Sequence, residues 1–240
     1  MKPEIYMWEG FREHVLEKHD AFVEAMKERV FPIFRDIDSE AEGFADKKYN
    51  ELMSMPYWDE NVDASSIADM AQDLAIAKYE SLAFLKHEML LGALAGLYHL
   101  WERMLRDFLE HEFKHWMKRE LSEELAWKKS INQTLAMLGS FGWDPRKQPF
   151  FGEIDACRLI VNVYKHGKGD AVKTLAATYP RYVGHPLGLD MKDGFGLELL
   201  DHDHLKVTEV DILRIASNLR QFWETFPERL FPAVAPASRP

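Results

Sequence analysis

The sequence of 240 residues contains a single cysteine, Cys157. One cysteine excludes an internal disulfide and argues against the disulfide-stabilised scaffolds of small secreted proteins. So little cysteine suits a reducing compartment, and we expect a cytoplasmic protein. Cys157 falls on the apolar side of an expected helix, where a thiol usually acts as a small buried hydrophobe.

Long apolar runs are also lacking. The richest window, residues 89–101, is shorter than the roughly 18 apolar residues of a membrane span, and Glu102 and Arg103 follow it. The amino terminus does not have the apolar run that a signal peptide needs. We therefore expect no membrane partner and no secretion, and the chain shows no internal repeat.

Positive charge is scarce, since 30 Lys and Arg face 40 Asp and Glu, for a formal net charge of −10. This balance argues against a protein that coats nucleic acid without selectivity. Residues 126–185, however, hold nine Lys or Arg against four Asp or Glu, so this segment carries +5 and the remainder −15. A local basic surface suits an anionic ligand such as RNA or a nucleotide, although a solvated helix face gives the same pattern.

What the sequence does contain is apolar residues at helical spacing along most of its length. The spacing predicts an amphipathic helix over residues 8–31, and then a short helix and a loop within the acidic segment 33–63. A helix-forming pattern runs from about residue 65 to 118, with Gly92 and Gly96 as places for a bend or a close approach. We expect an all-α helical bundle with long central helices.

Shorter helices follow in the second half of the chain. Ser122 is expected to cap a helix that ends at Gly139, and apolar spacing predicts further helices over residues 151–166 and 170–178. Gly167, between the last two, provides the usual stop signal.

The last part of the chain is more broken. Four glycines and a proline predict a loop over residues 184–196, and a minor β-hairpin is expected near 196–208. The sequence Thr208-Glu-Val-Asp211 resembles a capping box and opens a final helix. We divide the chain into three regions: an acidic helical extension (1–63), a helical domain (64–230) and a disordered tail (231–240).

The helix expected over residues 151–166 is apolar over most of its circumference. At about 100° per residue, its polar side chains fall within an arc of roughly 100°. This polar stripe consists of Asp155, Arg158, Asn162, Lys165 and His166. Such a helix is buried except along the stripe, which must face a cleft, a partner or a substrate because unpaired buried polar groups are costly.

The residue types of the polar stripe suit phosphodiester chemistry. Arg158 offers a fixed cation for a phosphate, Asn162 an amide that orients a group, and His166 a proton shuttle near neutral pH. A purely structural interpretation is open as well. Asp155 and Arg158 would then form an i,i+3 ion pair, Asn162 would bond a neighbouring backbone group, and His166 would cap the helix end.

A second motif, His111-Glu112-Phe-Lys-His115, matches the zinc-hydrolase pattern H-E-x-x-H. On a helix, both imidazoles would share one face. A lysine stands between the two ligands, and no third ligand follows at a known spacing, although His202 and His204 are candidates by residue type. The alternative is that both histidines pack against another element at the end of the long helix.

An apolar helix carrying Asn162-x-x-x-His166, with lysine and glycine flanking the histidine, follows an earlier helix with Glu102-Arg-Met-Leu-Arg106. This combination resembles the HEPN superfamily of small all-helical domains. Many members are metal-independent ribonucleases of toxin–antitoxin and phage-defence systems, and others are non-catalytic binding modules. In active members the arginine usually stands closer to the catalytic histidine than Arg158 does to His166, which are separated by seven residues.

The resemblance implies a role for each of these residues. His166 would act as general acid/base on the 2′-hydroxyl or the leaving oxygen, Arg158 would hold the phosphate, and Asn162 would orient one of them. Lys165 and Lys168 would add positive charge toward the substrate. The resemblance further implies an RNA or nucleotide ligand, no cofactor or metal, a homodimer, and an antitoxin or another protein as partner. The alternative is a non-catalytic binding or regulatory module, in which the displaced arginine has ended catalysis.

Overall fold

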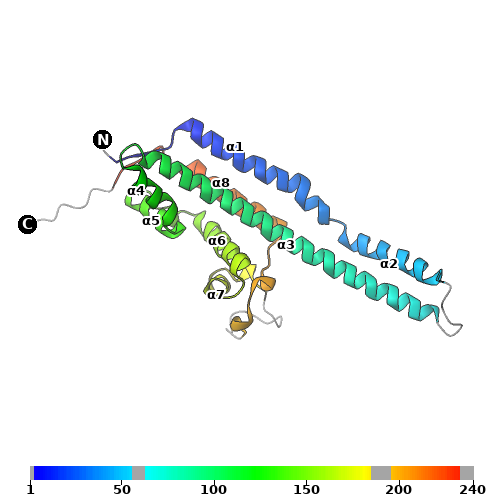
Figure 1. Cartoon of the computed structure of the whole chain (residues 1–240). Coiled ribbons are helices and arrows are strands. Elements are labelled where there is room, and N and C mark those ends of the chain that lie inside the picture. The colour runs from blue at the N-terminus through cyan, green and yellow to red at the C-terminus, as the bar shows by residue number, and fades with distance from the viewer. Residues whose placement is uncertain (1–2, 56–62, 185–195, 233–240) are drawn as a thin grey trace, which may run out of the picture. The chain divides into compact units, whose positions relative to one another are not determined.

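A computed structural model describes residues 3–55, 63–184 and 196–232 (Figure 1). Helices account for most of these residues, and one pair of two-residue strands is the only sheet within them. The expected all-α helical bundle is therefore confirmed. In the same ranges a membrane-spanning helix is absent, since none combines the necessary length with sufficient apolar character.

The chain forms two compact units that share helix α3 (Ala64–Phe113). The first unit comprises residues 1–24 and 93–240, and the second comprises residues 25–92. Helix α3 stays helical through Gly92 and Gly96. The helix does not break at Gly96. Glycine instead allows a close approach there, because the ring of Phe22 lies 3.1 Å from the position that a Cβ atom of Gly96 would take.

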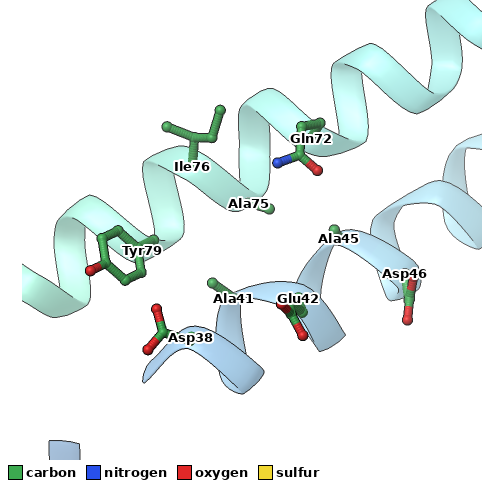
Figure 2. Close-up of a pocket in the computed structure, with 9 residues that line it drawn as sticks. All are labelled: Asp38, Ala41, Glu42, Ala45, Asp46, Gln72, Ala75, Ile76 and Tyr79. Atoms are coloured by element: carbon green, nitrogen blue, oxygen red, sulfur yellow. The ribbon is translucent and has the colours of Figure 1, made fainter. Parts of the chain in front are cut away.

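The second unit is built on helix α2 (Ile37–Met53), which lies beside the first part of α3 (Figure 2). A π-helical turn over Met26–Val30 and a 3-10 turn over Phe31–Phe34 precede α2. Alanines face each other across the two helices, and small side chains permit a close approach. The buried apolar residues of these helices within the unit are Ala41, Ile67, Ala71, Ala75, Leu90 and Leu91.

The first unit packs its helices around an aromatic core. Trp101 of α3 meets Phe222 edge to face at 5.2 Å between ring centroids, and Phe226 contacts both Phe108 and Trp143. The remaining helices of this unit are α1 (Glu9–Ala25), α4 (Arg119–Glu123), α5 (Ile131–Ser140), α6 (Phe151–His166), α7 (Asp170–Thr178) and α8 (Glu209–Thr225). The core therefore draws on the middle and the end of the sequence.

Strand pairing occurs at a different place from the one expected. The hairpin predicted near residues 196–208 is not formed, because 3-10 turns occupy Leu197–Leu199 and His202–His204. Leu205 instead makes an isolated antiparallel bridge with Val183. The described sheet pairs β1 (Ile5–Tyr6) with β2 (Arg229–Leu230), so it joins segments near opposite ends of the sequence.

The cap expected at Ser122 also lies elsewhere. Ser122 is fully buried inside α4, and its hydroxyl donates to the carbonyl of Arg119 at 2.7 Å. The following helix, α5, is capped by Ser130, which forms a capping box with Gln133. A π-helical turn over Glu124–Lys128 separates the two helices. The helical spacing of apolar residues continues through this turn, so the sequence did not indicate that one helix ends and another begins here.

Arg106 fastens this irregular segment to α3. Its guanidinium is buried and donates to the carbonyl oxygens of Ala126 at 2.6 Å and Lys129 at 3.1 Å. Glu102, one turn earlier on α3, accepts from the same guanidinium at 2.6 and 3.0 Å. The Glu102–Arg106 pair of the sequence motif therefore has a structural role here.

Two of the expected segments fall mainly outside the described residues. The loop predicted over 184–196 is described only at Gly184 and Gly196, and the predicted tail 231–240 only at Phe231 and Pro232. The domain division at residues 63 and 230 stays a prediction. Cys157, as expected, is fully buried on α6, and this burial raises the pKa of its thiol.

Candidate functional site

Helix α6 spans Phe151–His166, as the sequence predicted, and its exposure follows the predicted pattern. The apolar residues between Ile154 and Val163 are buried, whereas the members of the polar stripe are half-buried or exposed. Gly167 ends the helix with φ at +74°, and its amide donates to the carbonyl of Val163 at 2.7 Å. A side chain would be strained at this φ, so glycine is needed for the chain to turn into α7.

Arg158 takes part in a polar network within the first unit. Its Nε and Nη2 donate to Asp155 Oδ1 at 2.9 and 2.7 Å, and the hydroxyl of Tyr179 donates to Asp155 Oδ2 at 3.2 Å. Burial and the neighbouring Asp155 carboxylate raise the pKa of Tyr179 to about 12. The i,i+3 ion pair of the structural interpretation is therefore present. To bind a phosphate, Arg158 would have to exchange this carboxylate.

The basic side chains at the carboxyl-terminal end of α6 are not held in a network of this kind within the described part of the chain. Lys165, His166 and Lys168 are exposed, and they make no hydrogen bond or ion pair with the residues that the structure describes. The carboxyl-terminal end of a helix favours positive charge because of the helix dipole. These three side chains form a small cationic surface that is open to an anionic ligand.

A second imidazole reaches the same end of α6. His202 Nδ1 lies 3.8 Å from the position that a Cβ atom of Gly167 would take. His202 is partly exposed, and its Nε2 is 3.3 Å from Asp203 Oδ1. The neighbouring His204 is held by Asp201 through a contact of 2.8 Å between Nδ1 and Oδ1. The sequence motif contained no sign that His202 would lie beside Gly167.

Arg158 stands apart from this end of the helix. It precedes His166 by eight residues, which corresponds to about 12 Å along the helix axis at roughly 1.5 Å per residue. This distance is larger than one phosphate group. Arg158 and His166 of one chain could therefore contact the same phosphate only if the long arginine side chain extended toward His166. Within one chain, the stripe therefore divides into an ion-paired half at Arg158 and an open half at His166.

A further polar cluster adjoins the other end of α6, and the sequence reading missed it. The hydroxyl of Tyr182 donates to Glu153 Oε2 at 2.6 Å, and Arg181 pairs with the same carboxylate. Burial alone would raise the pKa of Glu153, but the hydrogen bonds from Tyr182 and Arg181 hold it below its ordinary value. Arg214 of α8 donates to the Tyr182 hydroxyl at 3.2 Å. The cluster links α6 to α8, and each charged side chain in it lies beside a group of opposite charge.

The histidines of the H-E-x-x-H motif do come together. One potential ligand atom from each of His111, Glu112 and His115 lies within 4.8 Å of the others. The two imidazoles are exposed and meet edge to face at 5.1 Å, while Glu112 is buried. They line a cavity of about 260 Å³ together with residues of the β1–β2 pair and two tryptophans, Trp8 and Trp116.

A larger groove, of about 440 Å³, lies in the second unit between α2 and α3 (Figure 2). Three carboxylates follow one side of α2 at Asp38, Glu42 and Asp46, and Ile76 and Tyr79 of α3 line the opposite side. The groove contains no imidazole, thiol or hydroxyl nucleophile apart from the phenol of Tyr79. Its side chains offer no set of groups for acid–base or covalent catalysis.

The chain matches no family model, no curated protein and no solved structure in comparisons with each. Any function must therefore be argued from the residues themselves. The exposed end of α6 is the strongest candidate site, because its imidazole and lysine side chains can transfer protons and bind anions.

Proposed function

We propose that the protein is a metal-independent endoribonuclease of the HEPN type, with its active site at the carboxyl-terminal end of α6. The observation that carries the proposal is the exposed imidazole of His166 on a cationic helix end, with the imidazole of His202 beside Gly167. Imidazoles can act as general acid and base near neutral pH, and free lysines can bind the phosphates of RNA without a metal. The toxin or phage-defence role that the resemblance implies belongs to the same proposal.

The reaction would be an internal transesterification. One neutral imidazole takes the proton of the 2′-hydroxyl as the oxygen attacks phosphorus, and one protonated imidazole gives a proton to the departing 5′-oxygen. The O2′–P bond forms and the P–O5′ bond breaks, which leaves a 2′,3′-cyclic phosphate and a 5′-hydroxyl. His166 and His202 would share these two roles.

The remaining residues would bind and orient the substrate. Lys165 and Lys168 attract the phosphates as flexible point charges. Asn162 lies one turn before His166 on the same face of α6 and orients the attacking or the leaving group. A homodimer with facing stripes would place Arg158 of the partner subunit near this end, where a guanidinium stabilises the charge on the phosphate. An antitoxin or another protein that covers the stripe would silence it.

The test is cleavage of total cellular RNA by the purified full-length protein in the presence of EDTA. We expect cleavage by the wild type and a loss of at least about 100-fold in His166→Ala, the scale of a general acid–base group. His202→Ala should lose activity to a similar extent. His99→Ala, which removes an exposed histidine of α3, is the matched control and should cleave normally.

Two results would contradict the proposal. The first is intact RNA with the wild type under all conditions, and the second is cleavage that persists unchanged in His166→Ala. A product that ends in a 3′-phosphate monoester from the start, without a cyclic intermediate, would rule out the transesterification. Size-exclusion chromatography with light scattering tests the homodimer separately.

A second candidate is a binding module without catalysis. It is favoured by the engagement of Arg158 with Asp155, which removes the residue that holds phosphate in active HEPN proteins. In that case RNA or a nucleotide should bind and stay intact. Lys165→Ala and Lys168→Ala should each weaken binding and reduce its salt dependence, because phosphate contacts release counterions.

A further inference from the structure

We propose that His111, Glu112 and His115 form a binding site for a divalent transition metal of the zinc class, independently of the proposed nuclease site. The three side chains lie at the end of α3, where one potential ligand atom from each is within 4.8 Å of the others. In a tetrahedral zinc site, bond lengths of about 2.0–2.2 Å set the ligand atoms roughly 3.3 Å apart. Metal binding would therefore require the two exposed imidazoles to move closer to Glu112 and to each other.

The burial of Glu112 supplies the electrostatic reason for a cation. The residue is 6% exposed, and its Oε2 accepts a hydrogen bond of 2.8 Å from the backbone amide of Tyr6. Glu112 forms no ion pair with any residue in the described part of the chain. A buried carboxylate without a cationic partner is costly, and a bound metal ion would compensate its charge.

The cations near the site are already neutralised by other carboxylates. Lys114, which stands between the two histidines in sequence, pairs with Glu110, and Trp127 donates to the same carboxylate at 2.6 Å. Arg229 of β2 pairs with Glu4 and lies over the ring of Tyr6 at 4.2 Å. Neither cation therefore opposes a metal ion with its full charge. The carboxyl-terminal end of α3 adds the negative end of a helix dipole.

The type of ligand selects the class of metal. Two imidazoles and one carboxylate suit Zn²⁺, Co²⁺ or Ni²⁺, whereas Mg²⁺ and Ca²⁺ prefer oxygen ligands throughout. Helix α3 ends at Phe113, so His115 lies in the turn beyond the helix. Because Glu112 also holds the amide of Tyr6, the metal would fasten the β1–β2 pair to the end of α3. The site therefore acts as a structural clasp.

The experiment uses the untagged full-length protein, freed of metal with EDTA and dialysed. Co²⁺ is titrated and followed by its visible d–d absorption, and Zn²⁺ is then added in competition. We expect saturation at one Co²⁺ per chain, displacement by Zn²⁺, and a higher midpoint of thermal unfolding with Zn²⁺. His111→Ala and His115→Ala should each weaken Zn²⁺ binding at least tenfold, and Glu112→Gln should weaken it while it keeps an acceptor for the Tyr6 amide.

His99→Ala, on the same helix but outside the cluster, is the matched control and should bind Zn²⁺ like the wild type. The proposal is overturned if the Co²⁺ spectrum does not saturate, or if the His111→Ala/His115→Ala double variant binds Zn²⁺ as tightly as the wild type. Wild-type affinity in Glu112→Gln would overturn the assignment of the carboxylate as the third ligand. RNA cleavage in EDTA should be the same in all these variants, so the two proposals fail independently.

Discussion

His202 Nδ1 lies 3.8 Å from the point where a Cβ atom of Gly167 would be. Gly167 directly follows His166 in sequence. The turn that holds His202 is brought there because the chain pairs Val183 with Leu205 and so returns to the end of α6. His202 thus comes from a separate segment to lie against Gly167, whose φ is positive. The geometry of this helix end is therefore open to a direct test.

Gly167→Ala should damage both stability and the site. A side chain at φ +74° is strained by about 1–3 kcal/mol, and the new methyl group would lie in van der Waals contact with His202, 3.8 Å from its Nδ1. We expect a lower free energy of unfolding by urea and reduced RNA cleavage. Gly152→Ala, in the first turn of the same helix and with no atom within 4 Å of its Cβ, should be neutral or stabilising by up to about 1 kcal/mol. Equal stability of the two variants would contradict the strain at Gly167.

Asp155→Asn should release Arg158 from its ion pair. If Arg158 contacts phosphate, the variant should bind RNA several-fold more tightly, at a cost in stability of about 1 kcal/mol for the lost pair. Asp144→Asn changes the net charge by the same amount and breaks the more exposed Asp144–Arg146 pair, so it controls for charge. Fluorescence anisotropy with a labelled RNA measures both. Equal gains in the two variants would show that only net charge matters and that Arg158 has no direct role.

Arg106→Ala should strongly destabilise the first unit. The substitution leaves the carbonyls of Ala126 and Lys129 without their donor and removes the partner of Glu102, and losses of about 3–5 kcal/mol are typical for such buried groups. Arg106→Lys should recover only part of this loss, because an ammonium group cannot reproduce the forked geometry of a guanidinium. Urea unfolding measures the loss.

Arg103→Ala provides the comparison for this prediction. Arg103 is exposed on the same helix, and surface substitutions of this kind usually change stability by no more than about 0.5 kcal/mol. If Arg103→Ala and Arg106→Ala unfold at the same urea concentration, the Arg106 network does not hold the segment after α4.

His19 should make the protein less stable in mild acid. It is buried on α1, and burial is the main cause that lowers the pKa of its imidazole, with Asp20 opposing and Arg220 adding to the effect. In the unfolded chain the imidazole binds a proton near its ordinary pKa of 6.5. Between that value and the lower folded pKa the unfolded state holds more protons, so the contribution is unfavourable below about pH 6.5 and absent above it.

The measurement is the midpoint of thermal unfolding from pH 7.5 down to 5.5. We expect His19→Leu to lose less stability over this range than the wild type, while His14→Leu, which changes an exposed histidine of the same helix, keeps the wild-type slope. Identical slopes in all three proteins would mean that protonation of His19 does not cause the loss of stability in mild acid.

Local signals in the sequence predicted the helices that frame the site. Apolar spacing and the stop at Gly167 gave α6 its correct bounds, and Thr208 and Asp211 form the expected capping box at the start of α8. The ion pair between Asp155 and Arg158 also follows from i,i+3 spacing alone. Each of these features depends on residues that lie within one or two helical turns of one another.

Features that depend on distant partners were not predictable in this way. The strand pair joins Ile5 to Leu230, and the position of His202 follows from the bridge between Val183 and Leu205. No local pattern records either pairing. The cap at Ser130 was missed for another reason, since the π-helical turn before it preserves apolar spacing while it changes the helical register.

The lone, fully buried Cys157 makes the chain well suited to site-directed labelling. Its raised thiol pKa and lack of exposure leave it almost inert toward maleimides near neutral pH. A cysteine introduced at an exposed position such as Lys168 would therefore accept a spin label or fluorophore alone, without prior removal of the native thiol. Distances between such labels in two copies of the chain would locate the two stripes in a dimer.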